Sequence, residues 1–310
     1  MTCRRCLLSL LTGLAFVVNW GSYSAAEVDT KQPSTVLRVA GIVLKWIRAD
    51  KEANYRRIEP LIREAARHGA QLVVTTECFL DGYSAEDRTI SEVEYRALGE
   101  PIPGGPYFQR LAALARELKI YLVAGILEAN GKDRFNTAVL IGPDGTLLGK
   151  YHKQRMDEER ARNTPGKVST VHDTPFGKMG ILICADRRYP DVVRRFRENG
   201  AEFLICPSGG MFGSKKNDPI VQSRSKENNI PIVFVHPAEF LVTNADGSIE
   251  ARTLVGDRLV IGKQQAGGPS DLNRIFYYDL PIRPGVLRQS DSGQTTRVPQ
   301  TESSNRRTSR

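Results

Sequence analysis

The stretch GKMGILICADRRYPDVVRRFRENG, residues 177–200, places one cysteine between an apolar run and a charged amphipathic segment. The run 177–185 predicts a buried strand, and the segment 190–200 predicts a helix. Cys184 therefore closes a strand, directly before an acid and two arginines. A strand followed by a helix is typical of α/β proteins, in which strand ends build functional sites.

The same alternation extends outward in both directions. Helices are predicted over 51–70, 105–119 and 221–229, and strands over 35–44, 71–77, 120–129, 136–153, 201–208 and 230–238. A Pro-Asp-Gly turn at 143–145 divides the fourth of these strands, and a last antiparallel piece surrounds 244–248. No linker divides residues 27–282, so we expect one α/β domain whose sheets are covered by helices.

The two ends of the chain differ from the middle. Residues 1–26 combine a basic start, an apolar run and the small residues Ser24 and Ala26, which is the order of a signal peptide cleaved near Ala26. The apolar run is shorter than the ~20 residues of a membrane span, although an uncleaved anchor is the alternative. The tail 283–310 is polar and arginine-rich, and we expect it to be disordered. These features predict a secreted or periplasmic protein without stable membrane insertion once the signal is removed.

The charge distribution argues against nucleic-acid binding, and the cysteine count argues against a fold held by disulfides. The formal net charge of +9 is carried mostly by the two ends, so no basic patch of the folded domain indicates nucleic-acid binding. Removal of the signal leaves Cys78, Cys184 and Cys206. Three cysteines do not make a disulfide framework, and at least one thiol must be free. We expect Cys78 and Cys206 to be buried structural residues.

Three reactive residue types each follow an apolar strand-like run: Glu77, Lys153 and Cys184. Each alone has an ordinary structural explanation as a loop acid, a solvated lysine or a small core residue. Other chemistries lack their motifs, because the sequence contains no H-E-x-x-H or C-x-x-C pair, no G-x-G-x-x-G or Walker A loop, and no G-x-S-x-G elbow. We therefore expect neither a metal nor a cofactor.

Taken together, the blocks around these residues resemble the nitrilase superfamily, the carbon–nitrogen hydrolases. The matching blocks are VVTTECFLDGY (73–83), FNTAVLIGPDGTLLGKYHKQ (135–154), EERARNTPG (158–166), TPFGKMGILICADRRYPD (174–191), LICPSG (204–209) and RSKENNIPIVFV (224–235). The resemblance covers nearly all of residues 36–282. It implies a four-layer α-β-β-α sandwich, a Glu–Lys–Cys site and assembly into homodimers or larger homo-oligomers.

The resemblance also implies a role for each site residue. Cys184 would attack an amide carbon to form a thioester acyl-enzyme, and Glu77 would transfer the protons. Lys153 and the backbone N–H of Ala185 would stabilise the oxyanion. A second glutamate assists in the family; Glu159 occupies its position, with Glu158 as the alternative one residue away.

The block CADRRYPD is similar to that of N-carbamoyl amino acid hydrolases, and aliphatic amidases also resemble this chain. By that resemblance Arg187 and Arg188 hold a substrate carboxylate, or else they form ion pairs with Asp186, Asp191 or a loop acid. We expect a linear amide or N-carbamoyl substrate and the release of ammonia. The alternatives are a catalytically silent binding protein, or a nitrile substrate. The second is disfavoured by Ala185 and Asp186, which stand where true nitrilases carry tryptophan and glutamate.

Overall fold

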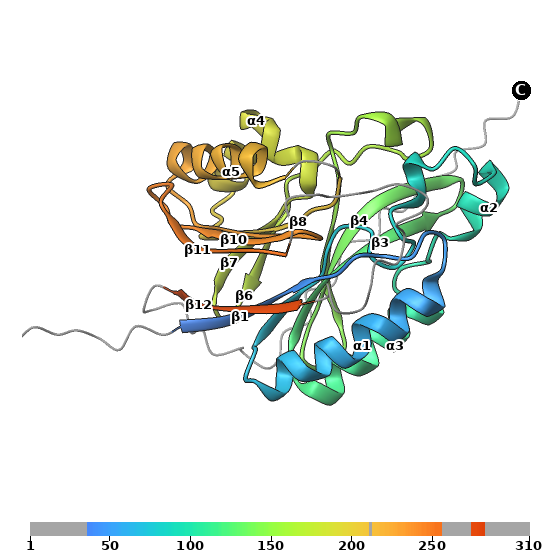
Figure 1. The fold of residues 1–310 in the computed structure, drawn as a ribbon, viewed down its shortest axis with the longest axis horizontal. Coiled ribbons are helices and arrows are strands. Elements are labelled where there is room, and N and C mark those ends of the chain that lie inside the picture. Colours follow the sequence, from blue (N-terminus) through green and yellow to red (C-terminus); the bar gives the residue numbers. More distant parts are fainter. Residues whose placement is uncertain (1–35, 211–212, 256–273, 283–310) are drawn as a thin grey trace, which may run out of the picture. The chain divides into compact units, whose positions relative to one another are not determined.

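The computed structural model describes residues 36–210, 213–255 and 274–282, which form two six-stranded sheets. In spatial order the first sheet contains β12 (Arg274–Pro281), β1 (Val36–Val43), β2 (Leu72–Val74), β3 (Tyr121–Asn130), β4 (Asp133–Ile141) and β5 (Leu147–His152). The second contains β11 (Ile249–Leu254), β10 (Glu239–Thr243), β9 (Ile232–His236), β8 (Phe203–Pro207), β7 (Gly177–Ile181) and β6 (Val171–Thr174). The two sheets face each other (Figure 1).

Each sheet has a parallel centre and antiparallel flanks. In the first sheet β1, β2 and β3 are parallel, and β4, β5 and β12 pair antiparallel at the two sides. In the second sheet β7, β8 and β9 are parallel, and β6, β10 and β11 are antiparallel. The carboxyl ends of parallel strands share one edge of a sheet, which is where α/β proteins place their sites.

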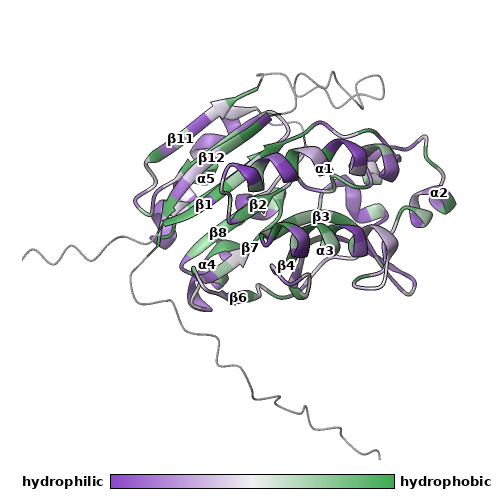
Figure 2. Ribbon diagram, turned by 90° about the horizontal axis from the view of Figure 1, so that it is seen from below, coloured by the Kyte–Doolittle hydropathy of each residue, from purple (hydrophilic) through white to green (hydrophobic). Residues whose placement is uncertain are grey.

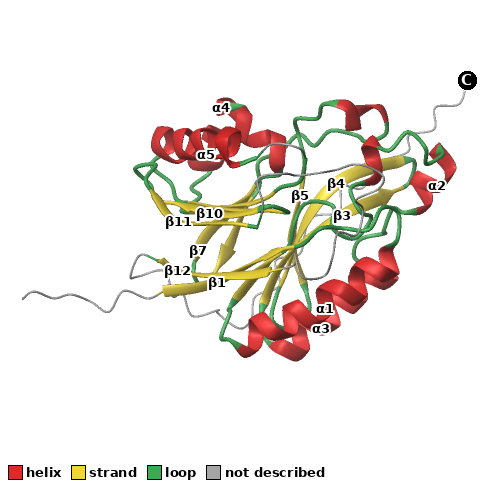
Figure 3. Cartoon of the chain, in the orientation of Figure 1, coloured by secondary structure: helices red, strands yellow, loops and turns green. Residues whose placement is uncertain are grey.

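Helices cover the outer face of each sheet. The helices α1 (Lys51–Arg67) and α3 (Pro106–Leu118) lie on the first sheet, and α4 (Pro190–Glu198) and α5 (Ser214–Asn228) lie on the second (Figures 1 and 3). The short elements α2 (Glu92–Ala97), η1 (Ser84–Glu86), η2 (Glu158–Ala161) and η3 (Cys184–Arg188) lie in loops. The predicted four-layer α-β-β-α sandwich is confirmed.

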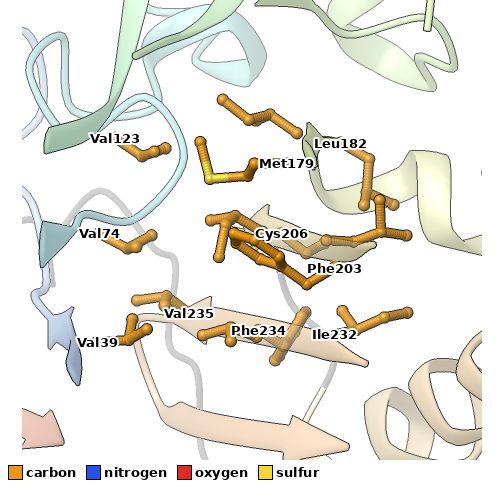
Figure 4. Close-up of a cluster of buried hydrophobic side chains, with 14 of the residues drawn as sticks. Val39, Val74, Val123, Met179, Leu182, Phe203, Cys206, Ile232, Phe234 and Val235 are labelled. Carbon is orange, nitrogen blue, oxygen red and sulfur yellow. The ribbon is translucent and has the colours of Figure 1, made fainter. Parts of the chain in front are cut away.

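Two apolar cores hold these layers together. Between the sheets, Val39, Val74 and Val123 of the first sheet face Met179 and Val235 of the second (Figure 4). A separate core packs α1 and α3 against the outer face of the first sheet. The outward sides of α1 and α3 are mainly hydrophilic, shown in purple, whereas the strands beneath them are mainly hydrophobic, shown in green (Figure 2). Burying both faces of a sheet explains the continuous apolar runs seen in its parallel strands.

The predicted elements agree with the structure except where apolar periodicity fails. The predicted strand 177–185 ends at Ile181, and Cys184 begins η3. The helix predicted over 221–229 begins earlier, at Ser214, because its first two turns carry charged and polar residues and Pro219. The strands β6 and β12 and the helix α2 were not predicted. The predicted signal, 1–26, and tail, 283–310, lie outside the described residues.

None of the helices in the described ranges is both long enough and apolar enough to cross a membrane.

Candidate active site

The three predicted strand-end residues meet at one cavity. Lys153 Nζ lies 2.8 Å from Glu77 Oε1, although the two residues are 76 positions apart in the chain. Lys153 and Cys184 both line a cavity of about 160 Å³. Glu77 reaches it from the first sheet beside Gly209, where an added Cβ would lie 3.0 Å from Glu77 Oε2. The sequence therefore placed all three residues at the same site.

Lys153 is the centre of the polar network. It follows β5 directly, and its backbone N–H donates to Asn136 O at 2.9 Å. Its ammonium group is 2% exposed and forms ion pairs with Glu77 and Glu159. Burial alone would lower the pKa of Lys153, but Glu159 and Glu77 together hold that pKa well above its usual value. Lys153 is therefore a permanent cation at neutral pH.

Asn136 of β4 fixes the two carboxylates relative to each other. Its Nδ2 donates to Glu77 Oε1 at 2.8 Å and to Glu159 Oε2 at 2.9 Å. Glu159 is buried at the start of η2, whereas its neighbour Glu158 is exposed and lines the cavity mouth. Of the two glutamates that the sequence left open, Glu159 is the one in contact with Lys153.

A close backbone crossing positions Glu77. β2 ends at Val74, and the chain then passes over Gly125 of β3, whose N–H donates to Thr75 Oγ1 at 3.0 Å. A Cβ on Gly125 would lie 2.4 Å from Thr76 O and 2.9 Å from Glu77 Cα. The carboxylate of Glu77 is fully buried, and its Oε2 has no hydrogen-bond partner among the described residues. That oxygen can therefore accept a proton.

Cys184 lies in a tight bend between β7 and η3. Its φ of +44° is unusual for a residue with a side chain and is typical of a strained functional position. The thiol lies 3.5 Å from Gly209 O, and Arg187 donates to Sγ at 3.5 Å. Burial and then the charge of Glu77 raise the pKa of the thiol to about 11, while Lys153 and Arg187 act in the opposite direction.

Asp186 ties this bend to the segment that follows Lys153. Its Oδ2 accepts from Tyr151 OH at 2.8 Å and from Ile183 N at 3.2 Å. Its Oδ1 accepts from the backbone N–H groups of Gln154 and Arg155 at 3.2 and 2.8 Å. Burial raises the pKa of Asp186 to about 6. Asp186 thus links the bend at Cys184 to the segment after Lys153, and its hydrogen bonds in the described ranges do not involve the side chain of Arg187 or Arg188.

The two arginines after Cys184 point to different surroundings. Arg187 is 2% exposed, and its second amino group donates to Asn217 Oδ1 of α5 at 2.6 Å. Arg188 is partly exposed and forms an ion pair with the loop acid Asp157. Arg187, Arg188 and Asp157 all line the cavity. Arg188 therefore forms an ion pair with a loop acid at the cavity, whereas Arg187 forms none among the described residues.

Ala185 lines the cavity in the first turn of η3, where backbone N–H groups have no acceptor inside a helix. This placement suits the predicted oxyanion donor. Cys78 and Cys206 are buried and unpaired, as expected for structural residues.

Sequence reasoning missed three residues of this site. Asn136 lies in one of the blocks that resemble the family, and the only indication of its role was that it is a polar residue within an apolar strand. Tyr83 and Glu86 form another wall of the cavity. Burial and the neighbouring carboxylates raise the pKa of Glu86. Tyr83 stacks on Trp46 with ring centroids 5.2 Å apart. These two residues come from a loop, for which strand patterns give no guide.

The described part of the chain contains no group of His, Cys, Asp and Glu side chains arranged to hold a metal ion.

Comparison with known proteins identifies the family of this chain. The carbon–nitrogen hydrolase family profile matches residues 38–257. The human omega-amidase NIT2 is 32% identical over 219 residues, which is 66% of this chain and 75% of that protein. A nitrilase from Pyrococcus abyssi is 34% identical over 175 residues, which is 56% of this chain and 65% of that protein. The chain belongs to the carbon–nitrogen hydrolase family of the nitrilase superfamily.

Solved structures support the fold. The Saccharomyces cerevisiae Nit3 structure, from the nitrilase superfamily, is 27% identical with a TM-score of 0.67, and the match covers 82% of this chain and 92% of that one. An amidase from Nesterenkonia sp. shares the fold at 22% identity, with a TM-score of 0.64 and coverage of 80% and 91%.

The crossing at Gly125 gives a direct test of how Glu77 is held. Gly125→Ala should lower the free energy of unfolding by about 1–3 kcal/mol and reduce turnover, because the new methyl group must displace the backbone that carries Glu77. Gly104→Ala is the matched control, since an added Cβ at Gly104 has no atom within 4 Å. Chemical denaturation and turnover measure both effects, and equal behaviour of the two variants would contradict this account.

Proposed function

We propose that this chain is an exported cysteine amidohydrolase, which cleaves the C–N bond of a linear amide or N-carbamoyl compound and releases ammonia. One observation carries the proposal. The thiol of Cys184 and the buried ammonium group of Lys153 line a single cavity. Oε2 of Glu77, which has no hydrogen-bond partner among the described residues, lies beside the lining residue Gly209. These are the nucleophile, the proton acceptor and the cation that hydrolysis of an amide requires.

The acylation half-reaction follows from this arrangement. Glu77 Oε2 takes the thiol proton as Sγ of Cys184 forms a bond to the carbonyl carbon of the substrate. The oxygen of the tetrahedral intermediate becomes an anion, which Lys153 Nζ and the N–H of Ala185 stabilise. Protonated Glu77 then gives its proton to the nitrogen, the C–N bond breaks and ammonia leaves a thioester behind.

Hydrolysis of the thioester reverses the proton path. Glu77 takes a proton from a water molecule, whose oxygen bonds to the thioester carbon. The Sγ–C bond then breaks, and Glu77 returns the proton to the thiol. Glu159 and Asn136 do not reach the reacting atoms in this scheme; they hold Lys153 and Glu77 in place.

The names of the relatives support the amide class. The human relative is an omega-amidase and the archaeal one a nitrilase. We favour an amide or carbamoyl compound over a nitrile. Position 186, where true nitrilases carry glutamate, holds the structural carboxylate Asp186, whose oxygens are already occupied by four donors.

The central prediction is release of ammonia from at least one compound in a panel of linear amides and N-carbamoyl compounds. Cys184→Ala should abolish turnover, and Lys153→Met should reduce it by on the order of 10²–10³ through loss of an oxyanion donor. Ammonia is measured with a coupled assay, and nitriles are included in the panel. Absence of turnover on the whole panel, together with resistance of Cys184 to iodoacetamide, would favour the silent binding protein.

We also propose that Arg188 meets a carboxylate on the substrate. Arg188 lines the cavity and already binds one carboxylate there, that of Asp157. A guanidinium group offers the same donors to a substrate carboxylate. For Arg187 this role stays a prediction, and its buried contacts favour a different one.

Arg188→Ala should raise KM for a carboxylate-bearing amide by about 10- to 100-fold, the size expected for loss of a charged hydrogen bond. An uncharged amide of the same length is the control, and its KM should change little. An unchanged KM for both compounds would show that Arg188 serves the loop and not the substrate.

We propose that the chain is exported, because residues 1–26 have the composition of a cleavable signal. Expression in a bacterial host should give a periplasmic or secreted protein whose N-terminus is Glu27, as found by intact mass. Full-length protein retained in the cytoplasm would contradict export. Assembly into a homodimer or larger homo-oligomer stays a prediction, which the same purified protein tests by light scattering.

A further inference from the structure

Arg187 is a buried cation without a carboxylate partner in the described ranges. Arg187 is 2% exposed, and its neighbours here are uncharged: its guanidinium group donates to Asn217 Oδ1 at 2.6 Å and lies 5.2 Å from the Phe234 ring centroid. The remaining polar contact is with Cys184 Sγ at 3.5 Å. A buried charge normally requires an opposite charge in contact with it.

The groups behind Arg187 do not supply that opposite charge. His236 is fully buried, and burial followed by the charge of Arg187 lowers its pKa to about 3, so its ring is neutral. Glu239 contacts Asn217 at 3.4 Å and not the guanidinium group. Burial and the neighbouring Asp218 raise the pKa of Glu239 to about 8, so it is largely protonated at neutral pH.

We propose that Arg187 is the counter-cation of the Cys184 thiolate and thus a further catalytic residue of this site. Sγ is the atom in hydrogen-bond contact with the guanidinium group that can become an anion. The inference rests on the proposed function, because it takes Cys184 as the nucleophile. Asn217 of α5 is a positioning residue, since it aims the guanidinium group at Sγ.

The charges that face the thiol show why a second cation matters. Lys153 forms ion pairs with Glu77 and Glu159, and Arg187 contacts Sγ at 3.5 Å. The Cys206 thiol also interacts with Arg187, but burial raises the pKa of Cys206 to about 12, so this thiol stays neutral. The other titratable or charged residues that line the cavity are Tyr83, Glu86, Asp157, Glu158 and Arg188. A thiolate at Cys184 would form close to the carboxylates of Glu77 and Glu159, and Lys153 is shared between those two carboxylates. Arg187 is the cation in hydrogen-bond contact with Sγ, so its charge favours the thiolate over the thiol.

The test follows the ionisation of Cys184 and needs no substrate. Iodoacetamide reacts with the thiolate, so the pH dependence of its reaction with Cys184 reports the thiolate fraction. The Cys184 peptide is followed by mass spectrometry, which separates it from Cys78 and Cys206. Because Glu77 is the proton acceptor of Cys184 in the proposed reaction, each comparison is made both in the native chain and in Glu77→Gln.

The midpoint is the pH at which the rate of alkylation of Cys184 reaches half its maximum. Arg187→Met should raise this midpoint by about one to three pH units, which slows alkylation at neutral pH by at least about tenfold. Arg188→Met is the matched control: it removes the same charge from the next residue, which pairs with Asp157, and should move the midpoint far less. Equal shifts in the two variants, or no shift in a folded Arg187→Met protein, would overturn the proposal.

A second pair of variants decides the matter if Arg187→Met does not fold. Arg187→Lys keeps the charge and should shift the midpoint less than half as far. Asn217→Ala keeps the guanidinium group but releases it from α5, and should raise the midpoint in the same direction. Unchanged midpoints in both folded variants would overturn the proposal as well.

These outcomes are independent of the proposed reaction. A chain that hydrolyses none of the panel compounds can still show an Arg187-dependent thiolate. Conversely, the chain can release ammonia through Cys184 while its alkylation midpoint does not change on substitution of Arg187. That result would support the proposed function and contradict only this inference.

Discussion

The ammonium group of Lys153, held between the carboxylates of Glu77 and Glu159, is the interaction on which the site depends. Three charges are buried together, and each is tolerable only because the others are present. Their residues come from the end of β2, the end of β5 and η2, so the first sheet must be correctly assembled before the charges can meet. Loss of Lys153 would leave two carboxylates buried side by side without a cation, which links the stability of the fold to the chemistry.

The second sheet contributes the nucleophile under a similar constraint. Cys184 occupies a left-handed backbone conformation that a residue with a side chain adopts only when its surroundings enforce it. Asp186 supplies much of that enforcement through four hydrogen bonds, two of them to the segment after Lys153. The bend that exposes the thiol and the loop that carries the lysine are therefore one unit, although they belong to different sheets.

How far the sequence predicts this site depends on the range of each interaction. Glu77, Lys153 and Cys184 were predicted because each follows an apolar strand-like run and stands in a block of sequence that resembles the nitrilase superfamily, and both signals are local. Asn136 and the environments of the two arginines were not, because their roles depend on contacts between segments far apart in the chain. Likewise, β12 was not predicted, because it is defined by its pairing with β1, more than 230 residues away in the chain. For example, Ile42 of β1 pairs with Ile275 of β12. The helix α5 begins with residues whose pattern is polar, so only its second half was predicted.

The two neighbouring arginines show why residue type alone does not fix a role. Arg187 and Arg188 carry the same group, yet η3 turns one into the protein interior and the other toward Asp157 at the cavity. In the interior a guanidinium group gains most from an anion that forms during the reaction, whereas at the cavity it gains most from an anion that the substrate brings. In our proposals, the two neighbouring arginines thus have separate roles: Arg187 acts on the thiolate of Cys184, and Arg188 binds the carboxylate of the substrate.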